Sequence, residues 1–206
     1  MIAIIDYGRG NLGSVEKAFE RVGIPATVTQ DPRAVDEADA VVLPGDGAFH
    51  DAMSNLAARN LIEPVRRALD GTRHFLGICL GYQLLFSTSE EFGDGRGLDV
   101  IPGVVRRFPR GRKVPHMGWN RLEHDGTMAI LAGIPSGAHF YFVHSYFPEL
   151  SAPAADLRLA HCDYGVRFPA AVQRGRIHAT QFHPEKSQRW GIRLLENFAA
   201  LVKERA

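Results

Sequence analysis

Phe75-Leu-Gly-Ile-Cys79-Leu-Gly-Tyr-Gln83-Leu-Leu-Phe86 is a short apolar run that stops at a cysteine and continues as a helical pattern. Residues 75–78 predict a buried strand, and residues 80–85 place their leucines at the spacing of one helix face, so Cys79 lies at the junction. The glycines on both sides allow a sharp turn that lifts a nucleophile above a sheet. A thiol at a helix N-terminus favours the thiolate and can hold an oxyanion nearby. The alternative is a buried thiol that packs as a small apolar side chain.

The composition limits the kinds of protein that this chain can be. Its 206 residues, 45% of them hydrophobic, suffice for one well-buried domain, and no shift in composition marks a second, so we expect a single domain over residues 1–206. The net charge of +1, with acidic and basic residues interspersed, argues against nucleic acid and membrane surfaces as partners. The two cysteines are Cys79 and Cys162, and the chain opens on strand-like residues. We therefore expect a cytoplasmic protein with free thiols.

The first half of the sequence alternates strand patterns with helical ones. Strands are predicted at residues 2–6, 26–30, 40–43 and 75–78, and helices at residues 12–22, from 32 onward, 48–58 and 61–69. This alternation predicts an α/β fold with a central, mostly parallel sheet flanked by helices. Ligands of such sheets bind at the carboxyl ends of the strands, so we expect the loops at residues 7–11 and 44–47 to meet Cys79 there.

After Glu91 the pattern changes. Glycines at positions 93, 95 and 97 predict a flexible loop, and few helical patterns follow. Strands are predicted at residues 104–108, 119–122, 140–147, 157–162, 170–173 and 177–182, the last two joined by a hairpin at residues 174–176. The second half is therefore expected to be a mixed or antiparallel extension, closed by an amphipathic helix from about Ser187.

A glycine motif near the N-terminus has two interpretations. Gly8-Arg-Gly10-Asn-Leu-Gly13 follows a strand, enters a helix and precedes Asp31 by roughly twenty residues, which is the fingerprint of a loop that binds a nicotinamide or flavin dinucleotide. No second mononucleotide-binding half follows it, however. The alternative is a glycine turn that brings Tyr7 and Asn11 to the functional edge of the sheet.

Thr180-Gln-Phe-His183-Pro-Glu185 ends a predicted strand just before the last helix. Proline holds the preceding residue in an extended conformation, so His183 and Glu185 can lean to the same side of the backbone. A histidine with a fixed carboxylate partner supplies a base and the group that orients it, and with Cys79 these residues suit nucleophilic catalysis. The spacing alone does not establish that Cys79 and His183 meet.

These motifs carry a resemblance to a known family. Gly77-Ile-Cys79-Leu-Gly81-Tyr-Gln83 and His183-Pro-Glu185 resemble the class I, or triad, glutamine amidotransferases. Asp6–Asn11, Pro115–Asn120 and Tyr141–Tyr146 are similar to one branch of that family, the glutaminase subunits of imidazole glycerol phosphate synthases in histidine biosynthesis. The resemblance covers essentially the whole chain and implies the single-domain class I glutamine amidotransferase fold.

The resemblance implies a catalytic triad of Cys79, His183 and Glu185. Cys79 would attack the carboxamide of glutamine, His183 would protonate the departing ammonia, and water would hydrolyse the glutamyl thioester. Glu185 would orient His183.

The resemblance also implies an oxyanion hole. It would use the Leu80 N–H and a donor from Pro44-Gly45-Asp46-Gly47, whose glycines allow the backbone to rearrange. Asp46 departs from the small apolar residue that relatives often carry. A carboxylate beside a developing oxyanion is unfavourable unless its side chain points away.

Substrate and partner positions follow from the resemblance as well. The glutamine-binding positions are matched by Gln83, Glu91, Ser145 and Tyr146, with Glu91 receiving the α-amino group and the Ser145–Tyr146 segment the carboxylate. The positions that face the synthase partner in relatives are matched by Asn11, Met117, Trp119, Tyr141, His144 and Lys186. As alternatives, Gln83 and Glu91 are ordinary polar residues, and Trp119 and Tyr141 are core aromatics.

The implied function is a glutaminase that passes ammonia to a partner synthase or cyclase subunit with a (β/α)₈ barrel, in a one-to-one heterodimer. The amidotransferase pattern takes up all 206 residues, which leaves no room for a second substrate domain. The resemblance implies no metal and no cofactor. Two alternatives remain: a glutaminase subunit of a different synthase, and a non-catalytic Rossmann-like dinucleotide-binding module.

Overall fold

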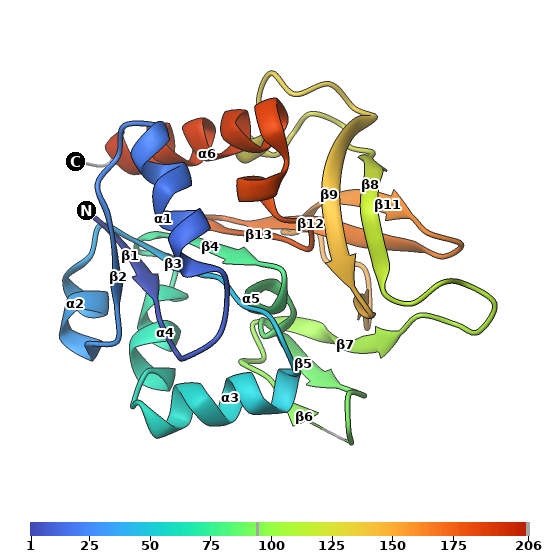
Figure 1. The fold of residues 1–206 in the computed structure, drawn as a ribbon, viewed down its shortest axis with the longest axis horizontal. Coiled ribbons are helices and arrows are strands. Elements are labelled where there is room, and N and C mark those ends of the chain that lie inside the picture. The colour runs from blue at the N-terminus through green and yellow to red at the C-terminus, as the bar shows by residue number, and fades with distance from the viewer. Residues whose placement is uncertain (94, 205–206) are drawn as a thin grey trace.

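A central sheet forms the middle layer of the computed structural model, which describes residues 1–93 and 95–204 (Figure 1). Among these residues the sheet has seven strands, in the order β11-β12-β13-β4-β3-β1-β2. They are β1 (Ile2–Ile5), β2 (Ala26–Thr29), β3 (Ala40–Leu43), β4 (His74–Ile78), β11 (Arg158–Asp163), β12 (Arg167–Arg174) and β13 (Ile177–Thr180). The strands from β13 to β2 run parallel, while β12 pairs antiparallel with β13 and with β11. The predicted α/β fold with a mixed extension is confirmed.

Helices cover both faces of this sheet. One face carries α1 (Leu12–Arg21) and α6 (Gln188–Lys203), and the other carries α2 (Pro32–Glu37), α3 (Phe49–Ala58) and α4 (Ile62–Ala68) (Figure 1). Successive strand residues point to opposite faces, so Val42 packs with the first group of helices and Val41 with the second. Strands buried on both faces need apolar side chains at every position, which is why β1 and β3 are uninterrupted apolar runs.

A second sheet and a ribbon extend this core. The second sheet contains β5 (Phe86–Ser89), β6 (Gly95–Arg96), β7 (Ile101–Arg107) and β10 (Tyr146–Leu150), and the ribbon pairs β8 (His116–Leu122) with β9 (Ala138–His144). Three short helical segments complete the described chain: α5 (Leu80–Gln83), η1 (Ala129–Leu131) and η2 (Pro184–Lys186). Figure 1 shows the ribbon standing at the β11–β12 end of the central sheet.

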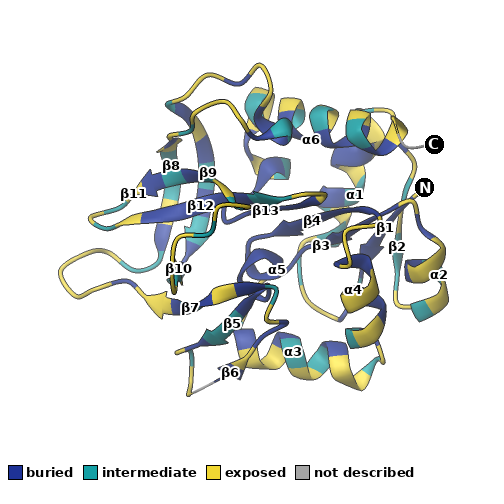
Figure 2. Cartoon of the chain, turned by 180° about the vertical axis from the view of Figure 1, so that it is seen from behind, coloured by how far each residue is buried: buried dark blue, intermediate teal, exposed yellow. Residues whose placement is uncertain are grey.

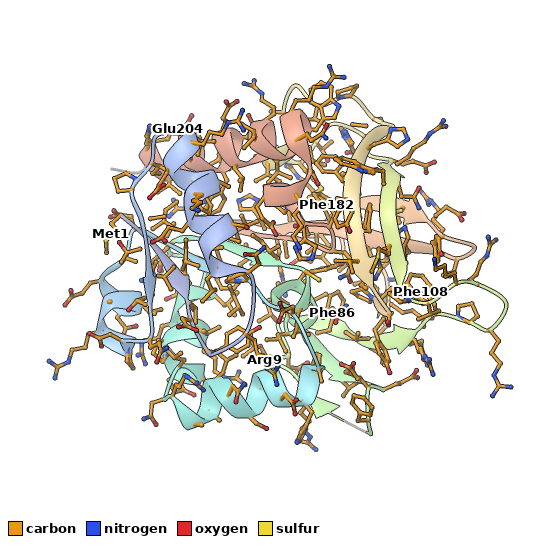
Figure 3. The ribbon with its side chains drawn as sticks, viewed as in Figure 1. Met1, Arg9, Phe86, Phe108, Phe182 and Glu204 are labelled. Carbon is orange, nitrogen blue, oxygen red and sulfur yellow. The ribbon has the colours of Figure 1, made fainter. Side chains whose placement is uncertain are left out.

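Aromatic side chains join the ribbon to the central sheet. Phe142 of β9 has its ring centroid 5.6 Å from that of Phe182 and 6.4 Å from that of Phe168, and the centroid of Phe108 lies 5.6 Å from that of Phe168. Figure 3 labels Phe108 and Phe182. Figure 2 shows that burial is concentrated in the strands of the central sheet and in the inner faces of the helices. None of the described helices is long and apolar enough to cross a membrane.

Three sequence predictions are wrong in detail. The helix after Cys79 ends at Gln83, and residues 84–85 lead into the unpredicted strand β5; their leucines are buried on all sides and therefore do not define a helix face. The strand predicted at residues 140–147 is two strands, β9 and β10, separated by Ser145. The loop predicted around residues 93–97 contains β6, which pairs antiparallel with β5.

Candidate active site

Cys79 forms the turn between β4 and α5 with an unusual backbone conformation. Its φ is +55° and its ψ is −105°, in a region that side chains other than glycine rarely occupy. Such strain costs on the order of 1–3 kcal/mol and persists only where the surroundings fix it. Here the Cys79 N–H donates to the Thr180 carbonyl at 2.7 Å, which ties the turn to β13. The conformation is that of a nucleophile elbow.

The glycines beside Cys79 are required by close packing. A Cβ on Gly81 would lie 1.8 Å from the Leu43 carbonyl oxygen, and one on Gly77 would lie 2.9 Å from the Gly81 carbonyl oxygen. The positive φ falls on Cys79 itself, while Gly81 lets the elbow lie directly against the end of β3 and Gly77 lets α5 fold back onto β4. The helix that follows has only four residues, two fewer than the helical pattern of residues 80–85 predicts.

His183 and Glu185 form the pair that their spacing predicts. His183 is extended, with φ −98° and ψ 100°, and Pro184 begins η2 directly after it. The Nδ1 of His183 lies 2.7 Å from Oε1 of Glu185, whose side chain is only 1% exposed. A buried carboxylate at this distance fixes the ring orientation and leaves Nε2 for chemistry.

The pKa of His183 reflects its neighbours. Burial lowers this pKa, but the charge of Cys79, a hydrogen bond with its sulfur and the Glu185 carboxylate outweigh burial and raise it to about 10. The hydrogen bond to the sulfur that helps to raise this pKa falls outside ordinary geometry, and Nε2 is buried without another partner among the described residues. Cys79 therefore lies next to an imidazolium, the arrangement that activates a thiol nucleophile.

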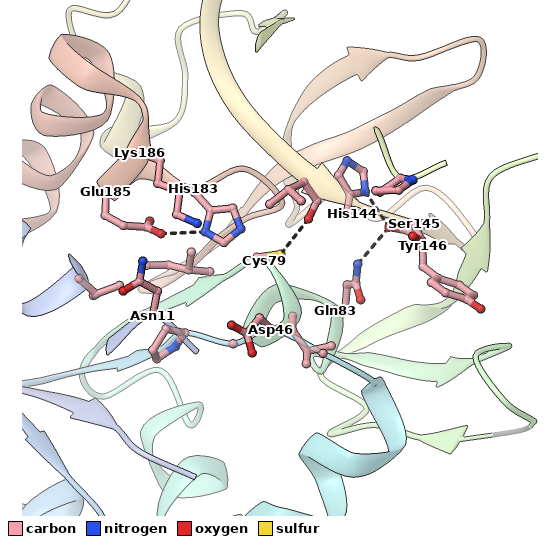
Figure 4. A pocket seen from close by; sticks show the side chains of 18 of the residues that line it. Asn11, Asp46, Cys79, Gln83, His144, Ser145, Tyr146, His183, Glu185 and Lys186 are labelled. Atoms are coloured by element: carbon pink, nitrogen blue, oxygen red, sulfur yellow. Dashed lines mark hydrogen bonds and ion pairs between the residues drawn. The ribbon is translucent and has the colours of Figure 1, made fainter. Parts of the chain in front are cut away.

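These groups line a cavity of about 430 Å³. Every residue predicted for catalysis, the oxyanion hole and glutamine binding contributes to it: Cys79, His183, Glu185, Leu80, Gly45, Asp46, Gly47, Gln83, Glu91, Ser145 and Tyr146. Figure 4 shows Cys79 between two groups, with His183 and Glu185 on one side and Gln83, Ser145 and Tyr146 on the other. The cavity is within the range of small-molecule sites.

The Pro44–Gly47 loop is held by the glycine turn near the N-terminus. Oδ1 of Asp46 accepts a hydrogen bond from the Gly10 N–H at 3.1 Å, so the acid that departs from the family pattern has a backbone partner. Gly45 leaves room for the buried Tyr7 hydroxyl, which a Cβ would approach to 2.0 Å. The turn thus supports this loop and brings Asn11 to the cavity, a placement that favours the glycine-turn interpretation of residues 8–13.

The glutamine-binding candidates surround the nucleophile. Nε2 of Gln83 donates to the Tyr146 carbonyl at 3.0 Å, and Ser145 lies at the break between β9 and β10. Oε2 of Glu91 accepts from the Phe49 N–H at 2.7 Å, and burial raises the pKa of this carboxyl group. A carboxylate acceptor from Glu91 and an amide from Gln83 therefore lie in the cavity of Cys79, and both can hydrogen-bond an amino-acid substrate.

Sequence reasoning missed Gln181. Its side chain is fully buried, its Nε2 donates to the Cys79 sulfur at 3.8 Å, and its Oε1 accepts from Gln83 at 3.0 Å. Gln181 precedes His183 by two residues in the bend that follows β13, and both side chains face Cys79. A polar side chain two positions before His183, at the end of β13, is the signal that could have identified it.

The predicted partner positions fall into two groups. Met117 and Trp119, which are 60% and 46% exposed, lie on the outer face of the ribbon, where the ring of Trp119 stacks edge-on to Tyr141 with centroids 6.0 Å apart. Asn11 and Lys186 are exposed residues that line the cavity. The interpretation of Trp119 as a core aromatic is wrong because nearly half of its surface is exposed.

His144 needs a correction. Its side chain is only 6% exposed and contacts buried groups, so it does not lie on the surface with Met117 and Trp119. The alternation of β9 explains this placement, because Tyr141 and Val143 occupy one face of the strand and Phe142 and His144 the buried one.

The comparisons with known proteins agree with this geometry. A model of the family "Glutamine amidotransferase class-I" matches residues 3–202. The chain is 54% identical over 207 residues to the imidazole glycerol phosphate synthase subunit HisH of Syntrophotalea carbinolica, covering 96% of this chain and 98% of that protein. It is 50% identical over 206 residues to the subunit of the same name from Desulfitobacterium hafniense (strain DSM 10664 / DCB-2), covering 100% of this chain and 97% of that protein.

Solved structures share the fold at lower identity. One described as "Crystal structure of glutamine amidotransferase" superposes with a TM-score of 0.75 at 21% identity, over 98% of this chain and 100% of that chain. The structure of PurLQS from Thermotoga maritima gives 0.73 at 16% identity, over 100% and 98%. Since the family model spans residues 3–202 and the curated relatives are about half identical over nearly their full length, the chain belongs to the class I glutamine amidotransferase family.

Proposed function

We propose that this chain is the glutaminase subunit of an imidazole glycerol phosphate synthase, which hydrolyses L-glutamine to glutamate and ammonia. The observation that carries the proposal is the meeting of Cys79, His183 and Glu185 in one cavity with Gln83 and the Ser145–Tyr146 segment. The identity of about 50% to subunits named HisH supports the choice among amidotransferases.

The first half of the proposed reaction forms a thioester. The Cys79 sulfur attacks the side-chain amide carbon of glutamine, with the proton of its thiol already on Nε2 of the His183 imidazolium. The carbonyl oxygen becomes an oxyanion, which accepts hydrogen bonds from the Leu80 N–H and from the backbone of residues 44–47. The C–N bond then breaks as His183 returns its proton to the leaving nitrogen, which departs as ammonia.

The second half releases the enzyme. Water attacks the thioester carbon while His183 accepts its proton, and the collapse of the second tetrahedral intermediate expels the thiolate and yields glutamate. Glu185 keeps the ring of His183 in place through both halves because it remains bonded to Nδ1.

The ammonia needs a protected route to a second active site. In water at neutral pH it becomes ammonium, which has no lone pair for attack. We propose a partner synthase or cyclase subunit with a (β/α)₈ barrel, bound one-to-one in the cytoplasm over the exposed side chains of Met117 and Trp119. Asn11 and Lys186, at the cavity, complete this surface. Residues 1–206 act as one domain in this assembly.

The Pro44–Gly47 loop is the proposed switch between resting and active states. Asp46 ties this loop to Gly10, so a change in the N-terminal turn moves the backbone that must serve the oxyanion. The test is glutamate release by the complex with and without the nucleotide substrate of the synthase. We expect faster release with the nucleotide; equal rates would contradict the switch, and no release in either case would contradict the glutaminase itself.

A further inference from the structure

A chain of buried side chains links the ribbon to the glutamine cavity. Nδ1 of His144 lies 2.7 Å from the Tyr146 carbonyl oxygen, and its Nε2 lies 3.0 Å from Nδ1 of His116. Nε2 of His116 lies 3.2 Å from the side-chain nitrogen of Asn120. Neither histidine takes part in the proposed reaction, so the contacts need another explanation.

The partners fix the direction of every bond. A carbonyl oxygen only accepts, so Nδ1 of His144 carries the proton that it donates to Tyr146. In the neutral ring Nε2 then accepts from the Nδ1–H of His116, whose Nε2 accepts in turn from the amide of Asn120. That amide is oriented by its own backbone partners: its nitrogen donates to the Asp163 carbonyl at 2.9 Å, and its oxygen accepts from the Arg121 N–H at 2.8 Å.

An extra proton on His144 would break this series of hydrogen bonds. Protonated His144 would donate from both nitrogens, so Nδ1 of His116 would have to accept. The proton of His116 would then lie on Nε2 and point at the Asn120 NH₂ group, which offers no acceptor. The surroundings oppose such protonation, because burial lowers the pKa of His116 to about 4. For His144, burial and the charges of His116 and His183 outweigh the bond to Tyr146 and lower the pKa to about 3. Both rings are therefore neutral.

Aromatic packing keeps the two rings in place. The ring of His116 is stacked against Tyr164, with centroids 4.0 Å apart, and against Phe142 at 4.8 Å. The ring of His144 lies 5.2 Å from Phe108 and 5.4 Å from Phe168. Rings enclosed in this way cannot swing to other partners without disturbing the packing between ribbon and sheet.

The series of hydrogen bonds from Asn120 through His116 and His144 ends at the substrate site. The Tyr146 carbonyl accepts from both His144 and Gln83, and Ser145 lies between the two residues that this bond joins. We propose that Asn120, His116 and His144 are positioning residues that set the Ser145–Tyr146 backbone and Gln83 for glutamine. The inference rests on the proposed function, because it assigns the network to glutamine binding. Since Met117 and Trp119 alternate with His116 and Asn120 on β8, the network also connects the exposed face of the ribbon to the cavity.

The hydrogen-bond chain can be tested without any activity. Histidine-labelled ¹⁵N NMR of the chain at neutral pH should show His116 and His144 as neutral rings with the proton on Nδ1, whereas histidine in water favours Nε2. Assignment comes from the loss of one signal set in His144→Asn. A proton on Nε2 of either ring, or an imidazolium, would overturn the proposal.

The positioning role is tested by kinetics of the complex. His144→Leu removes the donor to Tyr146, while His144→Asn, although smaller than histidine, keeps an N–H near the position of Nδ1. We expect His144→Leu to raise KM for glutamine about tenfold, the effect of one hydrogen bond, with kcat changed far less, and His144→Asn to restore most of the loss. His139→Asn, an exposed ribbon histidine, should behave as wild type.

The outcomes separate the two proposals. Ammonia-driven synthesis should be the same in all these variants, because it bypasses the glutamine cavity. Equal KM values for His144→Leu and wild type would overturn the positioning role even if glutaminase activity is strong. A wild-type complex without glutaminase activity would overturn the proposed function and with it this role, while the tautomers would still report on the hydrogen-bond chain.

Discussion

His183 is held as a cation by two neighbours, and the Glu185 carboxylate is the one that can be neutralised without removing the nucleophile. Burial alone would lower the pKa of His183, but Cys79 and Glu185 raise it to about 10. The imidazolium that protonates the leaving nitrogen of the amide is therefore present through neutral pH and is lost only in alkaline solution.

Replacing Glu185 with glutamine should lower the pH at which His183 loses its proton. Glu185→Gln removes a negative charge beside the ring, so the pKa of His183 falls and the alkaline limb of the kcat/KM profile moves to lower pH. The measurement is glutamate release by the complex from pH 6 to 10. An alkaline limb that stays in place would show that Glu185 does not set the charge of His183.

Gln181 should matter because its amide contacts the sulfur. Gln181→Met keeps the length of the side chain but removes the donor to Cys79 and the acceptor for Gln83. Loss of the contact with the sulfur and of the bond to Gln83 should together lower kcat/KM for glutamine roughly 10- to 100-fold. The control is Gln173→Met on β12, outside the cavity, which should retain activity; equal rates for both variants would remove Gln181 from the site.

Individual site residues differ in how far the sequence could predict them. Cys79, His183 and Glu185 could be predicted because local chemistry defines an elbow and a paired base. The buried position of His144 could have been inferred from strand alternation alone. Its bond to His116 could not, because β8 and β9 are joined only in three dimensions.

At the scale of elements, the contact between the elbow and β3 leads to a matched pair of variants. Gly81→Ala places a methyl group 1.8 Å from the Leu43 carbonyl oxygen, so the elbow must move; we expect a loss of stability of several kcal/mol and of most glutaminase activity. Gly13→Ala, in α1, meets nothing within 4 Å and should stabilise the chain by about 0.5–1 kcal/mol. Urea unfolding of both variants measures the difference. Similar stabilities would contradict the packing described for the elbow.

Strand prediction succeeds where burial alone explains the pattern. β1 and β3 are continuous apolar runs, and β4 is apolar after His74, because both faces are covered by helices. The break at Ser145 could not be predicted, because the same alternating pattern serves two sheets: β9 pairs with β8, while β10 pairs with β7. Partners that are distant in the sequence, not local propensity, decide where one strand ends.

At the scale of the whole molecule, buried histidines should make the fold sensitive to acid. Burial, with its neighbour His74, lowers the pKa of His178 to about 3, and His144 and His116 are lowered to about 3 and 4. A lowered histidine pKa stabilises the fold fully above the unfolded value of about 6.5, and this stability is lost as pH falls toward the folded pKa. Each such residue contributes a slope of about 1.4 kcal/mol per pH unit in that window.

Urea unfolding between pH 7 and 4.5 tests this expectation. The free energy of unfolding should fall with pH, and His178→Gln should have a shallower slope by about one proton. His50→Gln, which changes an exposed histidine, should keep the wild-type slope. His183 acts in the opposite sense, since its raised pKa gives stability that is complete below about 6.5 and lost as pH rises toward 10. A flat profile below pH 6.5 would contradict the neutral state of the buried rings.

The most direct test of the central claim compares two nitrogen sources in the complex of this chain with its synthase subunit. For Cys79→Ala we expect no synthesis with glutamine and unchanged synthesis with added ammonium salts, because the thiol is needed only to release ammonia. Cys162→Ala, which removes the other buried cysteine, should retain both activities. Glutamine-dependent synthesis by Cys79→Ala, or loss of both activities while the complex still assembles, would contradict the assignment of Cys79 as the glutaminase nucleophile.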